Sequence, residues 1–142
     1  MKRILVAVDG SEHSDKVLRR AREIGEKFNS EITILYVIST LRHQHPYVID
    51  GKIEAEINKL LLEQGKRILE ESLKVFENYP SKVTTFLKCG DPATEIIEKS
   101  HKEKCDLIVM GNRGLNIISR AMLGSVSNKV LNQVDISVLV VK

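Results

Sequence analysis

Residues 111–127 read Gly-Asn-Arg-Gly-Leu-Asn-Ile-Ile-Ser-Arg-Ala-Met-Leu-Gly-Ser-Val-Ser, and they directly follow the apolar run Leu-Ile-Val-Met at positions 107–110. The apolar run has the length and composition of a buried strand. From Val126 onward, Val130 and Val134 recur at helical spacing. This part of the chain therefore predicts a strand that ends in a glycine-containing loop, followed by the N-terminus of a helix.

The loop and the helix start have the composition of an anion site. Gly111 and Gly114 allow a positive φ and a close approach of a ligand to the backbone. Ser125 and Ser127 offer hydroxyls beside the amides of the first helical turn, where phosphates bind. The spacing is Gly-x-x-Gly, nine residues, then Gly-Ser, which is neither a Walker A loop nor Gly-x-Gly-x-x-Gly. Two ordinary turns flanking a surface loop are the alternative that this spacing leaves open.

Composition and charge narrow the function classes. The chain has 142 residues, and we expect residues 1–142 to form one domain with a sizeable core. A net charge of +3 is too small to indicate nucleic-acid binding, and 4% aromatic residues without tryptophan do not suit a base-stacking surface. The apolar runs are strand-sized, and the first ends at Asp9, too early for a signal peptide or a membrane helix. We therefore expect a cytoplasmic protein that binds neither nucleic acid nor membrane.

Strands and helices alternate along the chain. Runs rich in β-branched residues predict strands, and apolar residues at helical spacing predict helices. The expected strands are residues 3–8, 31–38, 83–87, 106–110 and 138–141. The expected helices follow Ser11, cover 53–77, begin at Pro92 and cover about 126–134. Ser11 or Ser14 would cap the first helix, and Asp91 would cap the helix that begins at Pro92.

Three groups of residues that resemble functional motifs have simpler interpretations. His43 and His45 lie in the irregular segment 39–52 without further ligands at metal-site spacing, which favours a solvated loop. Cys89 and Cys105 fit neither a disulfide framework nor a zinc site, and we expect two small core residues. The basic residues between 99 and 104 complement a helix C-terminus and are interpreted as solvated.

The alternating order predicts an α/β fold. Apolar strands that alternate with helices indicate a parallel sheet covered on both faces. Right-handed crossovers then favour a single, doubly wound, Rossmann-like domain with five strands in the order 3-2-1-4-5. Ligands of such sheets bind at the carboxyl ends of the strands where the order reverses, here between strands 1 and 4. The segments 9–11 and 111–127 would meet there, although they are about a hundred positions apart.

With these residues assembled, the chain resembles the universal stress protein family over nearly its whole length. The segments that carry the resemblance are Ile-Leu-Val-Ala-Val-Asp-Gly-Ser at 4–11, Gly-Asp-Pro at 90–92, Asp-Leu-Ile-Val-Met-Gly at 106–111, Gly-Ser at 124–125 and Val-Leu-Val-Val at 138–141. The spacing of Gly111, Gly114 and Gly124 is the pattern of the ATP-binding branch of that family.

The resemblance implies an ATP site with a divalent cation, Mg²⁺ or Mn²⁺. The residues that would line the adenine and the ribose are Ala7, Val8, Asp9 and Val37, the last through its backbone. The residues that would hold the ribose and the inner phosphates are Met110, Gly111, Arg113 and Gly114. The residues that would hold the outer phosphates are Gly124, Ser125, Val126 and Ser127.

Two positions depart from the family pattern, and three site residues have alternative interpretations. Ser137 stands where the family often has proline, and Asn112 where serine is common. Asp9 could be a turn former, and Arg113 a solvated loop charge. Ser125 could be a helix cap, which does not exclude phosphate binding because both use the same amides.

The leading hypothesis from the sequence is an ATP-binding regulatory protein that forms a homodimer through its C-terminal strand and acts on an unidentified protein partner. An apolar strand at a sheet edge favours association, and similar proteins dimerise there. A slow ATPase is the first alternative; we expect weak hydrolysis at most, because Asp9 is the one carboxylate expected near the site and would lie at the nucleoside end. The second alternative is an interaction scaffold that binds no nucleotide.

Overall fold

The predicted strands pair into one parallel sheet in a computed structural model, which describes residues 1–39, 50–112 and 122–142. The strands are β1 (Arg3–Val8), β2 (Glu31–Ile38), β3 (Val83–Cys89), β4 (Leu107–Gly111) and β5 (Ser137–Val141). Their order is β3-β2-β1-β4-β5, with every neighbouring pair parallel. The predicted doubly wound fold class is therefore confirmed.

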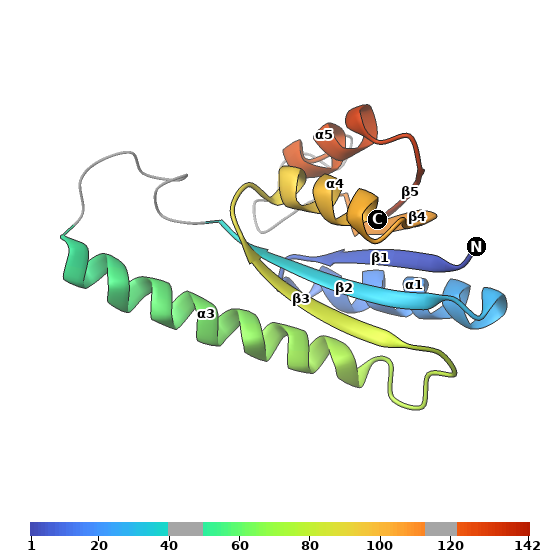
Figure 1. Cartoon of the computed structure of the whole chain (residues 1–142), viewed down its shortest axis with the longest axis horizontal. Coiled ribbons are helices and arrows are strands. Elements are labelled where there is room, and N and C mark those ends of the chain that lie inside the picture. Colours follow the sequence, from blue (N-terminus) through green and yellow to red (C-terminus); the bar gives the residue numbers. More distant parts are fainter. Residues whose placement is uncertain (40–49, 113–121) are drawn as a thin grey trace.

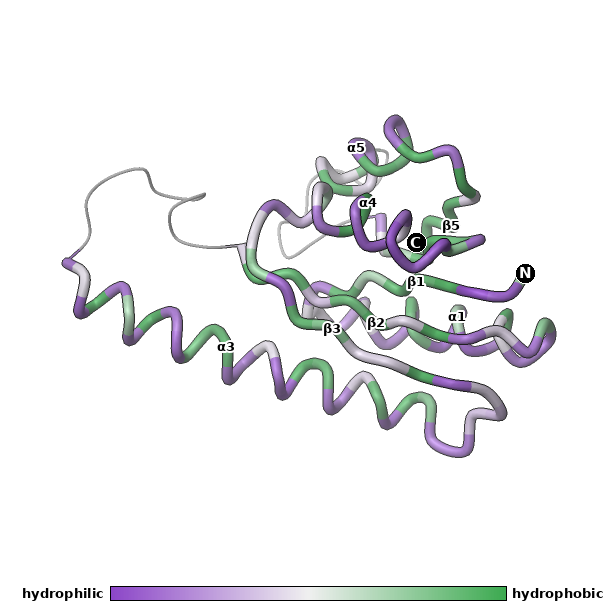
Figure 2. Tube along the Cα trace, in the orientation of Figure 1, coloured by the Kyte–Doolittle hydropathy of each residue, from purple (hydrophilic) through white to green (hydrophobic). Residues whose placement is uncertain are grey.

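Helices cover both faces of the sheet (Figure 1). They are α1 (His13–Phe28), α3 (Gly51–Lys74), α4 (Pro92–Lys102) and α5 (Ser125–Gln133). Side chains of α1 and α3 pack with Ile4 and Val6 on one face, and side chains of α4 and α5 pack with Leu5 on the other. Because neighbouring side chains of a strand point to opposite faces, β1 needs apolar residues at every position. Figure 2 accordingly shows most of β1 as hydrophobic after its hydrophilic start.

Only the C-terminal half of α3 packs closely on the sheet. Its first buried residue is Gly65, and the helix begins well beyond the strands (Figure 1). Ile53 and Leu60, which belong to the predicted apolar stripe, are 52% and 63% exposed. The helix also ends at Lys74 rather than at the predicted residue 77, although Phe76 is buried just beyond it.

The predicted cap of α1, Ser11 or Ser14, is wrong, and the predicted cap of α4 is correct. Glu12 occupies the N-cap of α1 and makes no side-chain cap bond, and the hydroxyl of Ser14, inside the helix, donates to Asp9. Ser11 likewise donates to Asp9 and does not cap the helix. The N-cap of α4 is Asp91 as predicted, since its carboxylate accepts from the Thr94 amide at 3.0 Å.

Two assignments of burial are also corrected. Cys105 is buried as expected, but Cys89 is exposed at the end of β3, which runs two residues further than predicted. Lys99 is not solvated: it is 5% exposed, its ammonium pairs with Glu103 at 2.7 Å, and it lies over the ring of Phe86. Burial raises the pKa of the Cys105 thiol to about 11, so this cysteine stays protonated and unreactive.

Candidate functional site

The predicted site residues gather at the carboxyl ends of the central strands. Ala7 and Val8 end β1, and Asp9 follows directly. Met110 and Gly111 end β4, and Ala7 pairs with Met110 across the two strands. Val37 lies one residue before the end of β2, on the other side of β1. Gly124 is the N-cap of α5, and Ser125, Val126 and Ser127 form its first turn. Arg113 and Gly114 lie outside the described residues, as do His43 and His45.

The loop after β1 is folded around one carboxylate oxygen. Asp9 Oδ1 accepts hydrogen bonds from Ser11 N at 2.9 Å, from Ser11 Oγ at 2.6 Å and from Ser14 Oγ at 2.9 Å. Gly10 has a φ of +77°, which lets the chain turn sharply after the strand. Asp9 is therefore a turn former, as the alternative interpretation held. All these bonds use Oδ1, so the turn does not require Oδ2.

The negative charge of Asp9 affects the pKa of a neighbouring side chain, Tyr36. Burial, and next to it the negative charge of Asp9, raise the pKa of the Tyr36 hydroxyl. Tyr36 stands on β2 opposite Val8, at the end of β1. The phenol of Tyr36 consequently stays neutral at physiological pH.

Hydrogen bonds to the carbonyl of Asn112 join the end of β4 to the start of α5. Asn112 O accepts from Gly124 N at 2.7 Å and from Ser127 Oγ at 3.3 Å. Ser127 Oγ also lies 3.0 Å from Gly124 O. The ends of the intervening loop are thus held next to each other.

The hydrogen bonds to Asn112 O determine which donors at the start of α5 remain available to a ligand. The Gly124 amide and the buried Ser127 hydroxyl are used within the protein. The amides of Ser125, Val126 and Ser127 have no acceptor within the helix, because they belong to its first turn. Gly124 is the N-cap of α5 and Ser125 is its first helical residue, so Ser125 is not the helix cap that the alternative interpretation proposed.

A residue that the sequence analysis did not single out joins this region. His13, the first residue of α1, has its Nε2 2.8 Å from Val141 O, the carbonyl at the end of β5. The same carbonyl accepts from Asn112 N at 3.2 Å. The contact joins residues 128 positions apart, and no local sequence pattern announces it.

The start of α4 is linked to α5 by charge. Lys129 Nζ lies 3.0 Å from Asp91 Oδ2 and 3.3 Å from Thr94 Oγ1. Hydrogen bonds from the Thr94 side chain and amide, and then from Lys129, lower the pKa of Asp91 to about 2. The carboxylate is therefore ionised at neutral pH and joins the start of α4 to α5 through Lys129.

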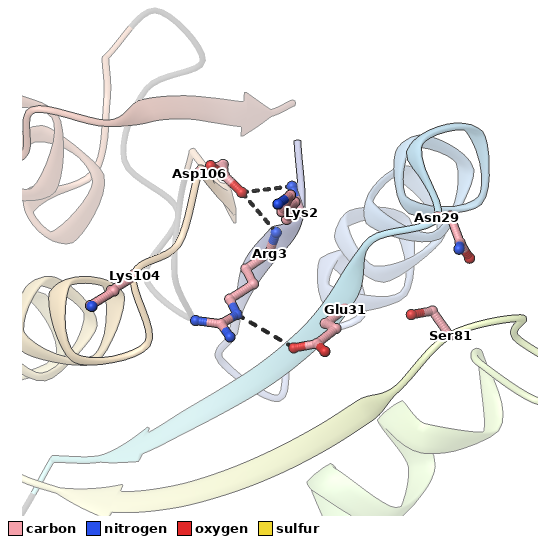
Figure 3. Close-up of a pocket in the computed structure, with 7 residues that line it drawn as sticks. All are labelled: Lys2, Arg3, Asn29, Glu31, Ser81, Lys104 and Asp106. Carbon is pink, nitrogen blue, oxygen red and sulfur yellow. Dashed lines mark hydrogen bonds and ion pairs between the residues drawn. The ribbon is translucent and has the colours of Figure 1, made fainter.

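A hollow of about 550 Å³ lies at the other end of the strands (Figure 3). Lys2, Arg3 and Glu31 line it at the starts of β1 and β2, and Asp106 lines it just before β4. Asp106 accepts from the amides of Lys2 and Arg3 at 2.7 and 2.8 Å, and Arg3 Nε pairs with Glu31 at 3.4 Å. These half-exposed charged residues join the first residues of neighbouring strands, and each interaction contributes little to stability. The hollow is separate from the predicted site.

Two further properties follow from the side chains and helices that are described. Within residues 1–39, 50–112 and 122–142, no cluster of three or more His, Cys, Asp or Glu side chains could hold a metal ion. Among the helices of these same segments, none is long and apolar enough to cross a membrane.

The chain is similar to proteins of one family throughout its length. The model of the universal stress protein family matches residues 1–142. Universal stress protein MJ0531 of Methanocaldococcus jannaschii is 36% identical over 144 residues, covering 99% of this chain and 82% of that protein. The solved structure of the hypothetical protein MJ0577 has a TM-score of 0.85 at 29% identity and covers 99% of this chain and 95% of its own. A universal stress protein from Archaeoglobus fulgidus, solved in complex with dAMP, shares the fold with a TM-score of 0.72 at 19% identity, covering 100% of this chain and 98% of its own.

Proposed function

The chain belongs to the universal stress protein family, and we propose that it is an ATP-binding, regulatory member of this family. The observation that carries the proposal is the meeting of two loops at the ends of β1 and β4, where the order of the sheet reverses. One loop brings a carboxylate with an oxygen that its turn does not require, and the other brings the first turn of α5. The structure with dAMP supports an adenine nucleotide, because it is a relative with the same fold.

The nucleoside would lie over the ends of β1 and β2. Asp9 Oδ2 suits a ribose hydroxyl, since a carboxylate oxygen accepts such a donor strongly. Ala7 and Val8 would pack beside it, and the backbone of Val37 would meet the adenine edge. Met110 would cover the ribose from the end of β4, where it is 4% exposed.

The phosphates would extend from Gly111 toward the start of α5. The amides of Ser125, Val126 and Ser127 point outward from a helix N-terminus, whose partial positive charge attracts an anion. The exposed Ser125 hydroxyl could add a donor, whereas Ser127 would act through its amide. Gly124 would contribute a close approach of the backbone, because its own amide already donates to Asn112 O. Arg113 and Gly114 complete the proposed set.

A divalent cation, Mg²⁺ or Mn²⁺, would enter with the triphosphate. Magnesium keeps several waters and is often held by substrate phosphates with one or two protein ligands. The proposed site fits this arrangement, because it offers the Ser125 hydroxyl at the helix start and does not depend on a protein cage. The cation would neutralise part of the phosphate charge at the start of α5.

The second part of the proposal is assembly. β5 is an edge strand, and Val138, Leu139 and Val140 are half-buried on it. An apolar edge with unpaired backbone groups favours pairing with another strand. We propose that β5 pairs with β5 of a second copy, that the protein works in the cytoplasm, and that bound ATP alters its interaction with a protein partner.

Calorimetric titration of nucleotide-stripped protein with ATP and Mg²⁺ tests the nucleotide proposal. The wild type should bind saturably, and Gly124→Val should abolish binding because its side chain would occupy the approach to the first turn of α5. Gly51→Val is the matched control, since a Cβ at Gly51 meets nothing within 4 Å and this residue lies at the start of α3. A folded wild type that binds no ATP and carries none when purified would favour the scaffold without nucleotide.

A further inference from the structure

Two hydrogen bonds from distant parts of the chain converge on the carbonyl of Val141. Asn112 N donates to it from the exit of β4 at 3.2 Å, and His13 Nε2 lies 2.8 Å from it at the start of α1. Because a carbonyl oxygen only accepts, the ring nitrogen of His13 carries the proton in this contact. The end of β5 is therefore held from two sides.

Both donors lie next to residues of the proposed ATP site. The carbonyl of Asn112 accepts from the Gly124 amide and the Ser127 hydroxyl, which fixes the start of α5. His13 is followed by Ser14, whose hydroxyl donates to Asp9 Oδ1 at 2.9 Å. On the β4 side the link from the start of α5 to the Val141 carbonyl consists of hydrogen bonds through Asn112, and on the Asp9 side it passes through the covalent bond between His13 and Ser14.

We propose that His13 is a positioning residue that couples nucleotide binding at the two loops to pairing of the β5 edge. This inference rests on the proposed function. Among the strands that the structure describes, β5 has β4 as its one neighbour, and the two donors hold the Val141 carbonyl at its end. A nucleotide that contacts Asp9 and the first turn of α5 would restrain these donors, and the edge would then lose less conformational freedom when it pairs with a second copy.

The coupling has a defined sign and must act in both directions. ATP should tighten the dimer, and by linkage the dimer should bind ATP more tightly than the monomer by the same factor. Coupling energies between sites in proteins typically correspond to a factor of about 5 to 150. His13 contributes because it is the side chain that joins the Asp9 loop to β5.

Sedimentation equilibrium with and without saturating ATP and Mg²⁺ measures this factor as the ratio of two dimer dissociation constants. The wild type should give a ratio of about 5 or more. His13→Leu has no donor and should bring the ratio close to 1. His13→Gln should restore it, because its amide nitrogen can reach the position of Nε2 and donate. His101→Leu, an exposed histidine on α4, is the matched control and should behave like the wild type.

Several outcomes would overturn the inference while leaving the proposed function intact. One is a wild type that binds ATP and dimerises with an unchanged dissociation constant. Another is His13→Leu with the wild-type ratio, and a third is loss of coupling in both His13→Leu and His13→Gln. A wild type that binds no ATP in calorimetry, or stays monomeric, refutes the proposed function itself and this inference with it.

Hydrogen exchange on the wild type provides a measurement that does not depend on how the variants fold. Saturating ATP should slow amide exchange in the peptide that carries Ser137–Lys142. Unchanged exchange in this peptide, with ATP bound, would contradict the coupling.

Discussion

Val140→Pro should produce a folded monomer, because the amide of Val140 faces the open edge of the sheet. The N–H and C=O of a strand residue point to the same side, and successive residues alternate. Val141 faces β4, since its carbonyl accepts from Asn112 N. By alternation Leu139 also faces β4, whereas Val138 and Val140 face away from it. Proline at Val140 therefore removes an N–H that the β4–β5 ladder does not use.

The expected effect on the proposed dimer is large. In a two-fold interface one substitution removes one donor from each subunit, so two are lost per dimer. Each lost donor leaves a partner carbonyl unpaired, which costs about 1–3 kcal/mol. The total of about 2–6 kcal/mol corresponds to a dissociation constant weakened roughly 30-fold to more than 10,000-fold.

Sedimentation velocity over a concentration series, with circular dichroism to verify folding, measures this effect. Leu139→Pro is the matched control in the same strand: it removes an amide that faces β4 and should destabilise the fold itself by about 1–3 kcal/mol. A Val140→Pro protein that is folded and still dimeric at wild-type concentrations would refute the assignment of β5 as the interface.

Two further predictions concern the loops around the site. Gly10→Ala forces a side chain into the left-handed region at a φ of +77° and places a Cβ 2.7 Å from the flexible end of Ile68, so urea unfolding should show a loss of about 2 kcal/mol; a change below about 0.5 kcal/mol would contradict it. The pKa of Asp91 is lowered to about 2 in the folded state, so its charge stabilises the fold above pH 4, and this contribution is lost as the pH falls toward 2. Asp91→Asn keeps a capping acceptor without the charge, so its deficit relative to the wild type should be below about 1 kcal/mol at pH 5 and shrink by pH 2.5, whereas a constant deficit would exclude the charge as its cause.

The strands of the sheet could be predicted because each is indicated by residues that are neighbours in the sequence. The continuous apolar run at 3–8 indicates a strand buried on both faces, and Asp91-Pro92 specifies a helix start through one side chain and one fixed φ. The order of the strands then followed from handedness rules that hold for all such folds. That the segments after β1 and β4 lie close together was predicted from the strand order, and no sequence motif was needed.

Features that depend on distant contacts were not predictable in the same way. The hydroxyl of Ser14 could either cap the helix or donate to Asp9. It donates to Asp9, which lies just before the sharp turn at Gly10. Lys99 looks solvated in the sequence, but the ring of Phe86 on β3 gives its ammonium a place inside the protein. His13 resembles any polar residue at the start of a surface helix, and its partner is the last strand residue of the chain.

The order of the sheet brings the proposed ligand site and the proposed interface onto adjacent strands. β4 has β1 as one neighbour, where the order of the sheet reverses, and β5 as the other, which is the edge strand. The amide nitrogen of Asn112 donates to the Val141 carbonyl on the edge strand, and its carbonyl oxygen accepts from Gly124 N and Ser127 Oγ at the start of α5. Under the proposed function, a displacement of the start of α5 by bound phosphates would reach Val141 through this one residue. A regulatory effect of ATP on assembly would need no change in the core, because every other strand of the sheet has neighbours or helices that hold it independently of Asn112.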